Sequence, residues 1–161
     1  MRKLKTLSVF LKNTGSSQLA FYVIEELNEL CKNNPSIDPV VFCENQHKNC
    51  IPPNFSIMDM SESWGARGDK IATSLSTAQC LIDTPCSGKK FFYVWDLEWI
   101  NHSRKVQEYE EYCGIYCNDS IEIISRSDSH KSILENSFNR KINHVIPDFN
   151  IDKILEVLKD G

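Results

Sequence analysis

Short apolar segments alternate along this chain with longer amphipathic segments. The apolar segments are rich in β-branched and aromatic residues and are bounded by turn-forming residues, which is typical of buried strands. They are 6–11, 39–43, 55–60, 91–95, 120–125 and 143–146. The amphipathic segments repeat their apolar residues at steps of three and four, which predicts helices. These helices are expected at 18–33, 70–83, 103–113, 126–138 and 150–159.

The order of these elements predicts the fold class. Strands and helices alternate from one end to the other, and the connections are too long for hairpins. Such a pattern is typical of βαβ units with right-handed crossovers. We therefore expect an α/β fold with three layers, a doubly wound and mostly parallel sheet of the Rossmann-like kind. The 161 residues contain no flexible linker, which predicts a single domain over 1–161.

The first predicted helix, 18–33, has the clearest pattern. Phe21, Ile24 and Leu27 recur on one face, which is expected to be buried. Ser16 or Ser17 is suited to cap its start, and Pro35 follows its end.

Charge and cysteine content exclude several classes of protein. The formal net charge of −4 argues against a nucleic-acid partner bound through its charged phosphate backbone. No apolar run reaches the roughly 18 residues that a membrane span needs, and the basic N-terminus lacks the apolar region of a signal peptide. The seven cysteines have no paired spacing typical of zinc sites, so we expect reduced thiols in a cytoplasmic protein with no metal and no cofactor.

Ligands of parallel α/β sheets bind outside the carboxyl ends of the strands. Three loops are expected there, at 13–17, 61–70 and 96–102. The most suggestive chemistry follows the strand 91–95, where Asp96 and Glu98 come next to tryptophans. A carboxylate at this edge can act as a general base or accept a hydrogen bond from a hydroxyl, so both acids are candidate catalytic residues.

Trp95 and Trp99 flank these two acids. An aromatic ring beside carboxylates can cover the C–H groups of a sugar while the carboxylates accept from its hydroxyls. Trp95, as part of a strand, is expected in the core, so Trp99 is the candidate substrate-binding ring. The other interpretation is that the acids cap and solvate a turn.

Two predicted helix starts supply further candidate binding residues. Asn13, Thr14 and Gly15 follow the first strand, where free backbone N–H groups can hold an anion, although an ordinary turn has the same pattern. Arg126 and Ser127 open a later helix. They indicate either a substrate site with Arg126 as donor or a helix cap made by the serine.

Three stretches of the chain resemble the N-terminal half of GT-B glycosyltransferases. They are the strand, loop and helix of 7–33, the sequence FFYVWDLEW at 91–99, and SIEIISRSDSHKSILENSF at 120–138 with INHVIPDFNIDKILEVL at 142–158. In the last stretch the comparable positions are Ser125, Ser127, Ile146, Pro147, Asp148 and Asp152.

This resemblance implies the acceptor side of a glycosyltransferase. In the family the nucleotide-sugar site and its paired acids lie in a second domain, which would begin where this chain ends. We therefore expect a domain that binds a sugar acceptor or a second protein subunit, and that can form a homo-oligomer. The alternative is a non-catalytic protein-interaction module on a Rossmann-like scaffold. The sequence contains neither a G-x-S-x-G elbow nor a P-loop motif.

Overall fold

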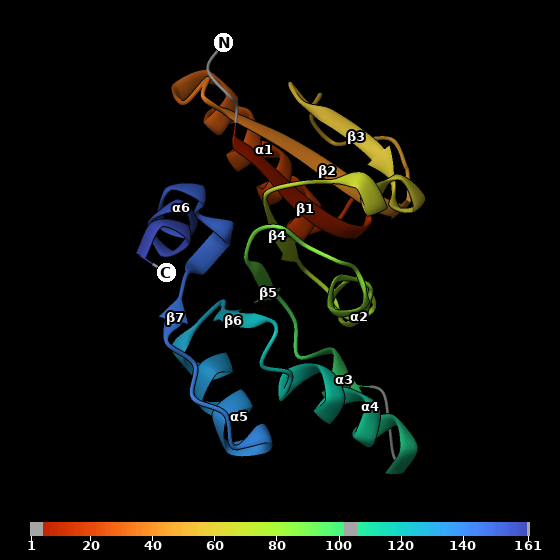
Figure 1. The fold of residues 1–161 in the computed structure, drawn as a ribbon, viewed down its shortest axis with the longest axis vertical. Coiled ribbons are helices and arrows are strands. Elements are labelled where there is room, and N and C mark those ends of the chain that lie inside the picture. The colour runs from red at the N-terminus through yellow and green to blue at the C-terminus, as the bar shows by residue number, and fades with distance from the viewer. Residues whose placement is uncertain (1–4, 102–105, 161) are drawn as a thin grey trace.

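The computed structural model describes residues 5–101 and 106–160. Its centre is one seven-stranded sheet in the order β3-β2-β1-β4-β5-β6-β7, and every pair of neighbouring strands is parallel. The strands are β1 (Lys5–Asn13), β2 (Ile37–Asn45), β3 (Ser56–Asp59), β4 (Asp69–Ala72), β5 (Lys90–Val94), β6 (Glu122–Ser125) and β7 (His144–Val145). The chain winds outward from β1 to β3, returns to β4 and then winds the other way (Figure 1).

Helices cover both faces of this sheet, so the fold is a three-layer, Rossmann-like α/β fold, as predicted. The apolar side chains of α1 (Gln18–Asn33) and α6 (Ile151–Asp160) share one core layer. Those of α2 (Leu75–Asp83), α4 (Val106–Tyr116) and α5 (Asp128–Phe138) share the other. The short elements are α3 (Glu98–Asn101) and the 3-10 turns η1 (Met60–Gly65) and η2 (Pro147–Phe149).

The central strands are buried on both faces. In β1, Leu7, Val9 and Leu11 belong to the layer under α1 and α6. Phe10 belongs to the opposite layer, where its ring lies 5.4 Å from that of Phe42. Burial on both faces explains why the sequence shows continuous apolar runs here, since alternation requires one solvated face.

One predicted helix start is wrong, because the sequence pattern concealed a strand. The segment 70–83 was expected to be helical throughout, but residues 69–72 form the buried strand β4 and α2 begins only at Leu75. Ile71 and Leu75 are four residues apart and therefore imitate a helical face. The strand is also short and contains Asp69 and Lys70, residue types that are depleted in strands.

This strand changes the position of the predicted loop 61–70. η1 follows the carboxyl end of β3, but the chain then crosses to the amino edge of the sheet. Gly68 adopts φ +86° there, in close contact with the backbone of Thr6, and Lys5 forms an ion pair of 2.8 Å with Asp69. The loop is therefore not a single segment at the ligand-binding edge.

The helix α1 has the predicted bounds, but its buried face is shifted. Ser17 caps it by accepting a hydrogen bond from the N–H of Ala20 at 3.1 Å. Val23, Ile24 and Leu27 are buried, whereas Phe21 is 38% exposed, so the prediction that Phe21 faces the core is wrong. The predicted helix 103–113 starts outside the described residues, and its described part is α4.

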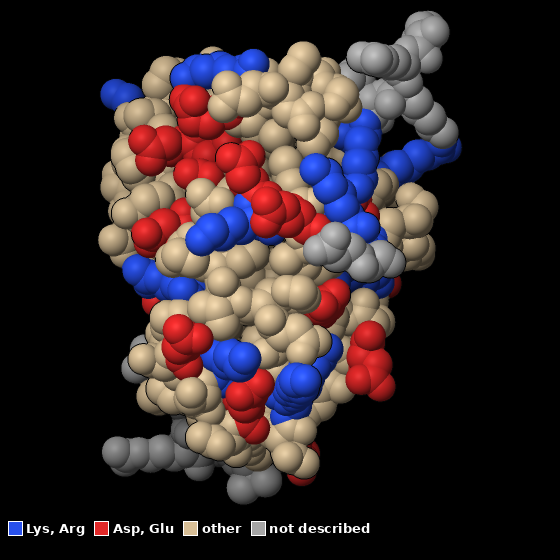
Figure 2. Space-filling model, turned by 90° about the vertical axis from the view of Figure 1, so that its left-hand side faces the viewer, with Lys and Arg blue, Asp and Glu red and all other residues tan. Residues whose placement is uncertain are grey.

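Within the described residues, no helix is long and apolar enough to cross a membrane. The same residues contain no group of three His, Cys, Asp or Glu side chains arranged to hold a metal ion. All seven cysteines are free thiols. The face on the left of Figure 1 carries charges of both signs, with acidic side chains gathered in its upper half (Figure 2).

Candidate functional site

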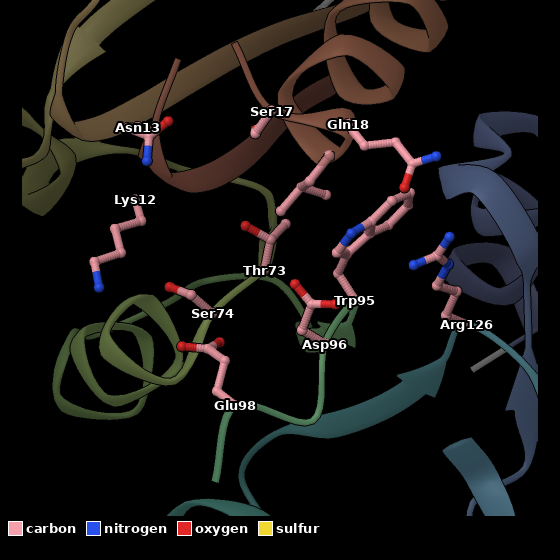
Figure 3. Close-up of a pocket in the computed structure, with 11 residues that line it drawn as sticks. Lys12, Asn13, Ser17, Gln18, Thr73, Ser74, Trp95, Asp96, Glu98 and Arg126 are labelled. Atoms are coloured by element: carbon pink, nitrogen blue, oxygen red, sulfur yellow. The ribbon is translucent and has the colours of Figure 1, made fainter. Parts of the chain in front are cut away.

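A pocket of about 420 Å³ opens at the carboxyl edge of the sheet (Figure 3). It lies where the chain leaves β1, β4, β5 and β6, so it spans the point between β1 and β4 at which the winding direction reverses. In doubly wound sheets this switch point is where ligands bind. The residues that line the pocket are Lys12, Asn13, Ser17, Gln18, Leu19, Thr73, Ser74, Trp95, Asp96, Glu98 and Arg126.

The loop after β1 is fixed by a reciprocal pair of hydrogen bonds. The hydroxyl of Thr14 donates to the carbonyl of His47 at 3.0 Å and accepts from its N–H at 3.0 Å. Gly15 packs against the same histidine, and its N–H donates to the side chain of Asn13. Of the three predicted binding residues, only Asn13 lines the pocket; Thr14 and Gly15 shape the loop.

The loop after β4 contributes two hydroxyl side chains that the sequence analysis missed. The hydroxyl of Thr73 donates to the carbonyl of Phe10 at 2.8 Å, which joins β4 to β1 at the switch point. Ser74 caps α2 by accepting from the N–H of Thr77. Both were assigned to a continuous helix, so their position at a strand end was not recognised; a correct prediction of β4 would have placed them here.

Asp96 and Glu98 both line the pocket, as their positions after β5 predicted, but their environments differ. Glu98 starts α3, and its carboxylate accepts a hydrogen bond of 3.0 Å from the N–H of Leu75 in the first turn of α2. One oxygen of this carboxylate is therefore already engaged. Asp96 is exposed and forms no hydrogen bond or ion pair with any described residue. Of the two acids, Asp96 is therefore the one free to act on a ligand.

Trp95 lies in the core, as predicted, but the prediction that Trp99 is the substrate-binding ring of the pocket is wrong. Trp95 lines the pocket although only 5% of it is exposed, and the guanidinium of Arg126 lies 3.9 Å from the centre of its ring. Trp99 is not among the lining residues: its ring meets that of Phe138 edge to face at 5.2 Å. The cause is the turn at Asp96, after which α3 directs Trp99 into the layer of α4 and α5.

At the start of α5 the capping interpretation of Ser127 is correct. Its hydroxyl accepts a hydrogen bond of 3.2 Å from the N–H of His130, and it does not line the pocket. Burial and the positive charge of Arg126 lower the pKa of His130, while the negative charge of Asp96 opposes this shift. His102, at the end of the predicted loop 96–102, lies outside the described residues.

The chain was compared with protein families, curated proteins and solved structures, and no match was found in any of the three. The fold and the pocket by themselves define the class: an α/β protein of the Rossmann-like kind with a ligand-sized pocket, lined by both polar and apolar surface, at its topological switch point.

Proposed function

We propose that this chain is the acceptor-side domain of a GT-B-type glycosyltransferase and binds a hydroxylated sugar acceptor in the carboxyl-edge pocket. The observation that carries the proposal is the carboxylate of Asp96, which is exposed and unpaired among the described residues at the mouth of that pocket. The resemblance of 7–33, 91–99, 120–138 and 142–158 to this class supports it as well.

The lining of the pocket suits a ligand with several hydroxyl groups. Asn13 and Ser17 offer both donors and acceptors, and Lys12 supplies a cationic donor (Figure 3). The hydroxyl of Thr73, which donates to Phe10, adds an acceptor. A polyhydroxylated ligand needs such closely spaced polar partners, because each of its buried hydroxyls must be hydrogen-bonded.

In the proposed reaction Asp96 is the general base. Its carboxylate takes the proton of one acceptor hydroxyl while that oxygen bonds to the anomeric carbon of a nucleotide sugar, and the nucleotide leaves with the electron pair of the broken glycosidic bond. The donor would be held by a separate domain or subunit. Glu98, tied to the first turn of α2, would orient the acceptor.

The test is calorimetric titration of the chain with simple glycans, nucleotide sugars and free nucleotides. We expect a glycan to bind, and Asp96→Asn to weaken that binding. The control is Asp38→Asn, the same change at an exposed aspartate near the amino end of β2. Binding of a nucleotide sugar alone would place the donor site here and overturn the proposal, as would glycan binding that Asp96→Asn leaves unchanged.

One observation favours a second function, a protein-interaction module. Trp64, on η1 beside the edge strand β3, is 67% exposed. Large aromatic residues are enriched in protein interfaces. If this surface mediates self-association, light scattering will show an oligomer that Trp64→Ser dissociates. A monomeric wild-type chain would contradict self-association.

A further inference from the structure

The proposed function does not specify the chemical class of the sugar acceptor, and the lining of the pocket indicates one. Building on that proposal, we infer that the acceptor carries an anionic group, a carboxylate or a phosphate, which Arg126 receives while stacked on Trp95. The inference concerns substrate class and specificity.

The register of the sheet brings these two residues together. Val94 and Ser125 are paired at the carboxyl ends of β5 and β6, so the residues that follow them, Trp95 and Arg126, leave neighbouring strands at the same level. The guanidinium lies 3.9 Å from the centre of the Trp95 ring. This distance is typical of direct stacking between a guanidinium and an aromatic face.

The ring that supports Arg126 is itself held in place. Trp95 lies 5.7 Å from the ring of Tyr22 on α1 and 6.4 Å from that of Tyr93 on β5. Its position is therefore set by two elements of the core. A guanidinium stacked on such a ring loses little further side-chain freedom when a ligand binds, so it is preorganised.

Arg126 has unused hydrogen-bonding capacity. Its guanidinium makes no hydrogen bond and no ion pair with any residue that the structure describes, and this includes Asp96, although both line the pocket. Stacking occupies one face of the group and leaves the N–H donors around its edge available. A guanidinium edge matches the two oxygens of a carboxylate or phosphate, which it can bind through two parallel hydrogen bonds.

The arrangement also places the cationic group of Arg126 apart from the carboxylate of Asp96 along the pocket. Arg126 and Lys12 lie on opposite sides of it, with Asp96 between them (Figure 3). An acceptor bound through its anionic group at Arg126 could present a hydroxyl to Asp96. A neutral sugar offers the guanidinium only uncharged hydroxyl acceptors and no pair of anionic oxygens, which is why we expect discrimination between charged and neutral acceptors.

Calorimetric titration with matched sugars tests the inference: glucose against glucuronate and glucose 6-phosphate, and the same three forms of galactose. We expect the wild-type chain to bind at least one anionic form about tenfold or more tightly than its neutral parent. The preferred form distinguishes a carboxylate from a phosphate. Arg126→Gln should abolish the preference by weakening the binding of the anionic form far more than that of its neutral parent. Arg126→Lys, which keeps the charge but lacks the planar edge, should retain only part of the preference.

The indole N–H signal of Trp95, assigned with Trp95→Phe, provides a direct readout by NMR and should shift with the anionic sugar in the wild-type chain but not in Arg126→Gln. Equal affinity for charged and neutral sugars, or an equal loss of both in Arg126→Gln, would overturn the inference and leave the acceptor proposal standing. Absence of any sugar binding that depends on Asp96 would overturn both. Thermal unfolding of each variant checks that it is folded. If Arg126→Gln is unfolded, the loss of preference in Arg126→Lys tests the inference instead.

Discussion

The N–H of Ile151 donates a hydrogen bond of 2.7 Å to the carboxylate of Glu26, which lies 125 residues earlier in the chain. This bond satisfies a free N–H group in the first turn of α6 and fixes α6 against α1. Burial, followed by repulsion from Asp152, Glu25 and Glu29, raises the pKa of Glu26, while the bond from Ile151 opposes the shift.

We expect Glu26→Gln to stabilise the chain at neutral pH, because glutamine can still accept from Ile151 but carries no charge. Glu26→Ala should destabilise it by about 1 kcal/mol, the usual cost of losing a helix cap. Because the pKa of Glu26 is higher in the folded chain than its ordinary value of 4.5, the folded state binds the proton first as the pH falls. The wild-type chain should therefore gain stability relative to Glu26→Gln as the pH falls through the folded pKa. Urea unfolding of both chains from pH 7 to pH 4 measures this change in relative stability. A difference in their free energies of unfolding that stays constant with pH would contradict the prediction.

Tyr93 connects the sheet to the segment before α6. Its buried hydroxyl donates to the carbonyl of Ile146 at 2.6 Å and accepts from the N–H of Phe149 at 3.0 Å, next to two consecutive residues with positive φ, Asp148 and Phe149. Burial raises the pKa of Tyr93 to about 12. Tyr93→Phe should cost about 2–4 kcal/mol, because it leaves two buried backbone groups unpaired. Urea unfolding measures the loss.

Tyr116 is the matched control for this substitution. It is fully buried like Tyr93, but its hydroxyl has no hydrogen-bond partner among the described residues. Tyr116→Phe should therefore change stability by less than about 1 kcal/mol or increase it. Similar losses in the two variants would mean that the contacts of Tyr93 contribute nothing specific.

Lys70 is a fully buried lysine on β4 that makes no ion pair within the described residues. Its ammonium donates to the carbonyl of Pro85 at 3.4 Å and lies 6.0 Å from the ring centre of Phe10. Burial lowers its pKa below the ordinary value of 10.5, with a further contribution from Lys90. We expect Lys70→Met to stabilise the chain by about 1–2 kcal/mol at neutral pH, since an unpaired buried charge is costly.

The pH dependence of this effect has a defined sign. Between the lowered folded pKa and 10.5 the unfolded chain binds more protons than the folded chain, so wild-type stability rises with pH in that window. The stability difference between Lys70→Met and the wild-type chain should therefore decrease as the pH rises through that window. Lys153→Met, the same change at an exposed position of α6, is the control and should show neither effect. A pH-independent advantage of Lys70→Met would refute the explanation.

Gly68 allows the chain to enter β4. It has φ +86°, and a Cβ atom there would lie 2.1 Å from the carbonyl oxygen of Thr6. Gly68→Ala should therefore destabilise the chain by about 2 kcal/mol or more.

Gly114 provides the opposite case: it lies within α4 and a Cβ atom there would meet nothing within 4 Å. Gly114→Ala should stabilise the chain by about 0.5–1 kcal/mol. Thermal unfolding of both variants tests the contrast.

The sequence alone determined the elements whose pattern is local and long enough to read. The helix α1 has its predicted bounds because sixteen residues repeat one apolar face between a serine cap and a proline. The strand β5 was recognised because its run of aromatic and β-branched residues is buried on both sides. The alternation of such elements was sufficient for the fold class, and the position of Asp96 directly after β5 was sufficient to place it at the carboxyl edge.

Only the tertiary structure decided which side chains meet at that edge. β4 gains its stability from pairing with β1 and β5, so four residues containing an aspartate and a lysine become a central strand, and Thr73 and Ser74 come to line the pocket. Trp95 meets Arg126 because β5 and β6 pair in one register, and Trp99 turns away because α3 begins between them. These relationships join residues far apart in the chain, and the physical forces that establish them, pairing and burial, leave no periodic signal in the local sequence.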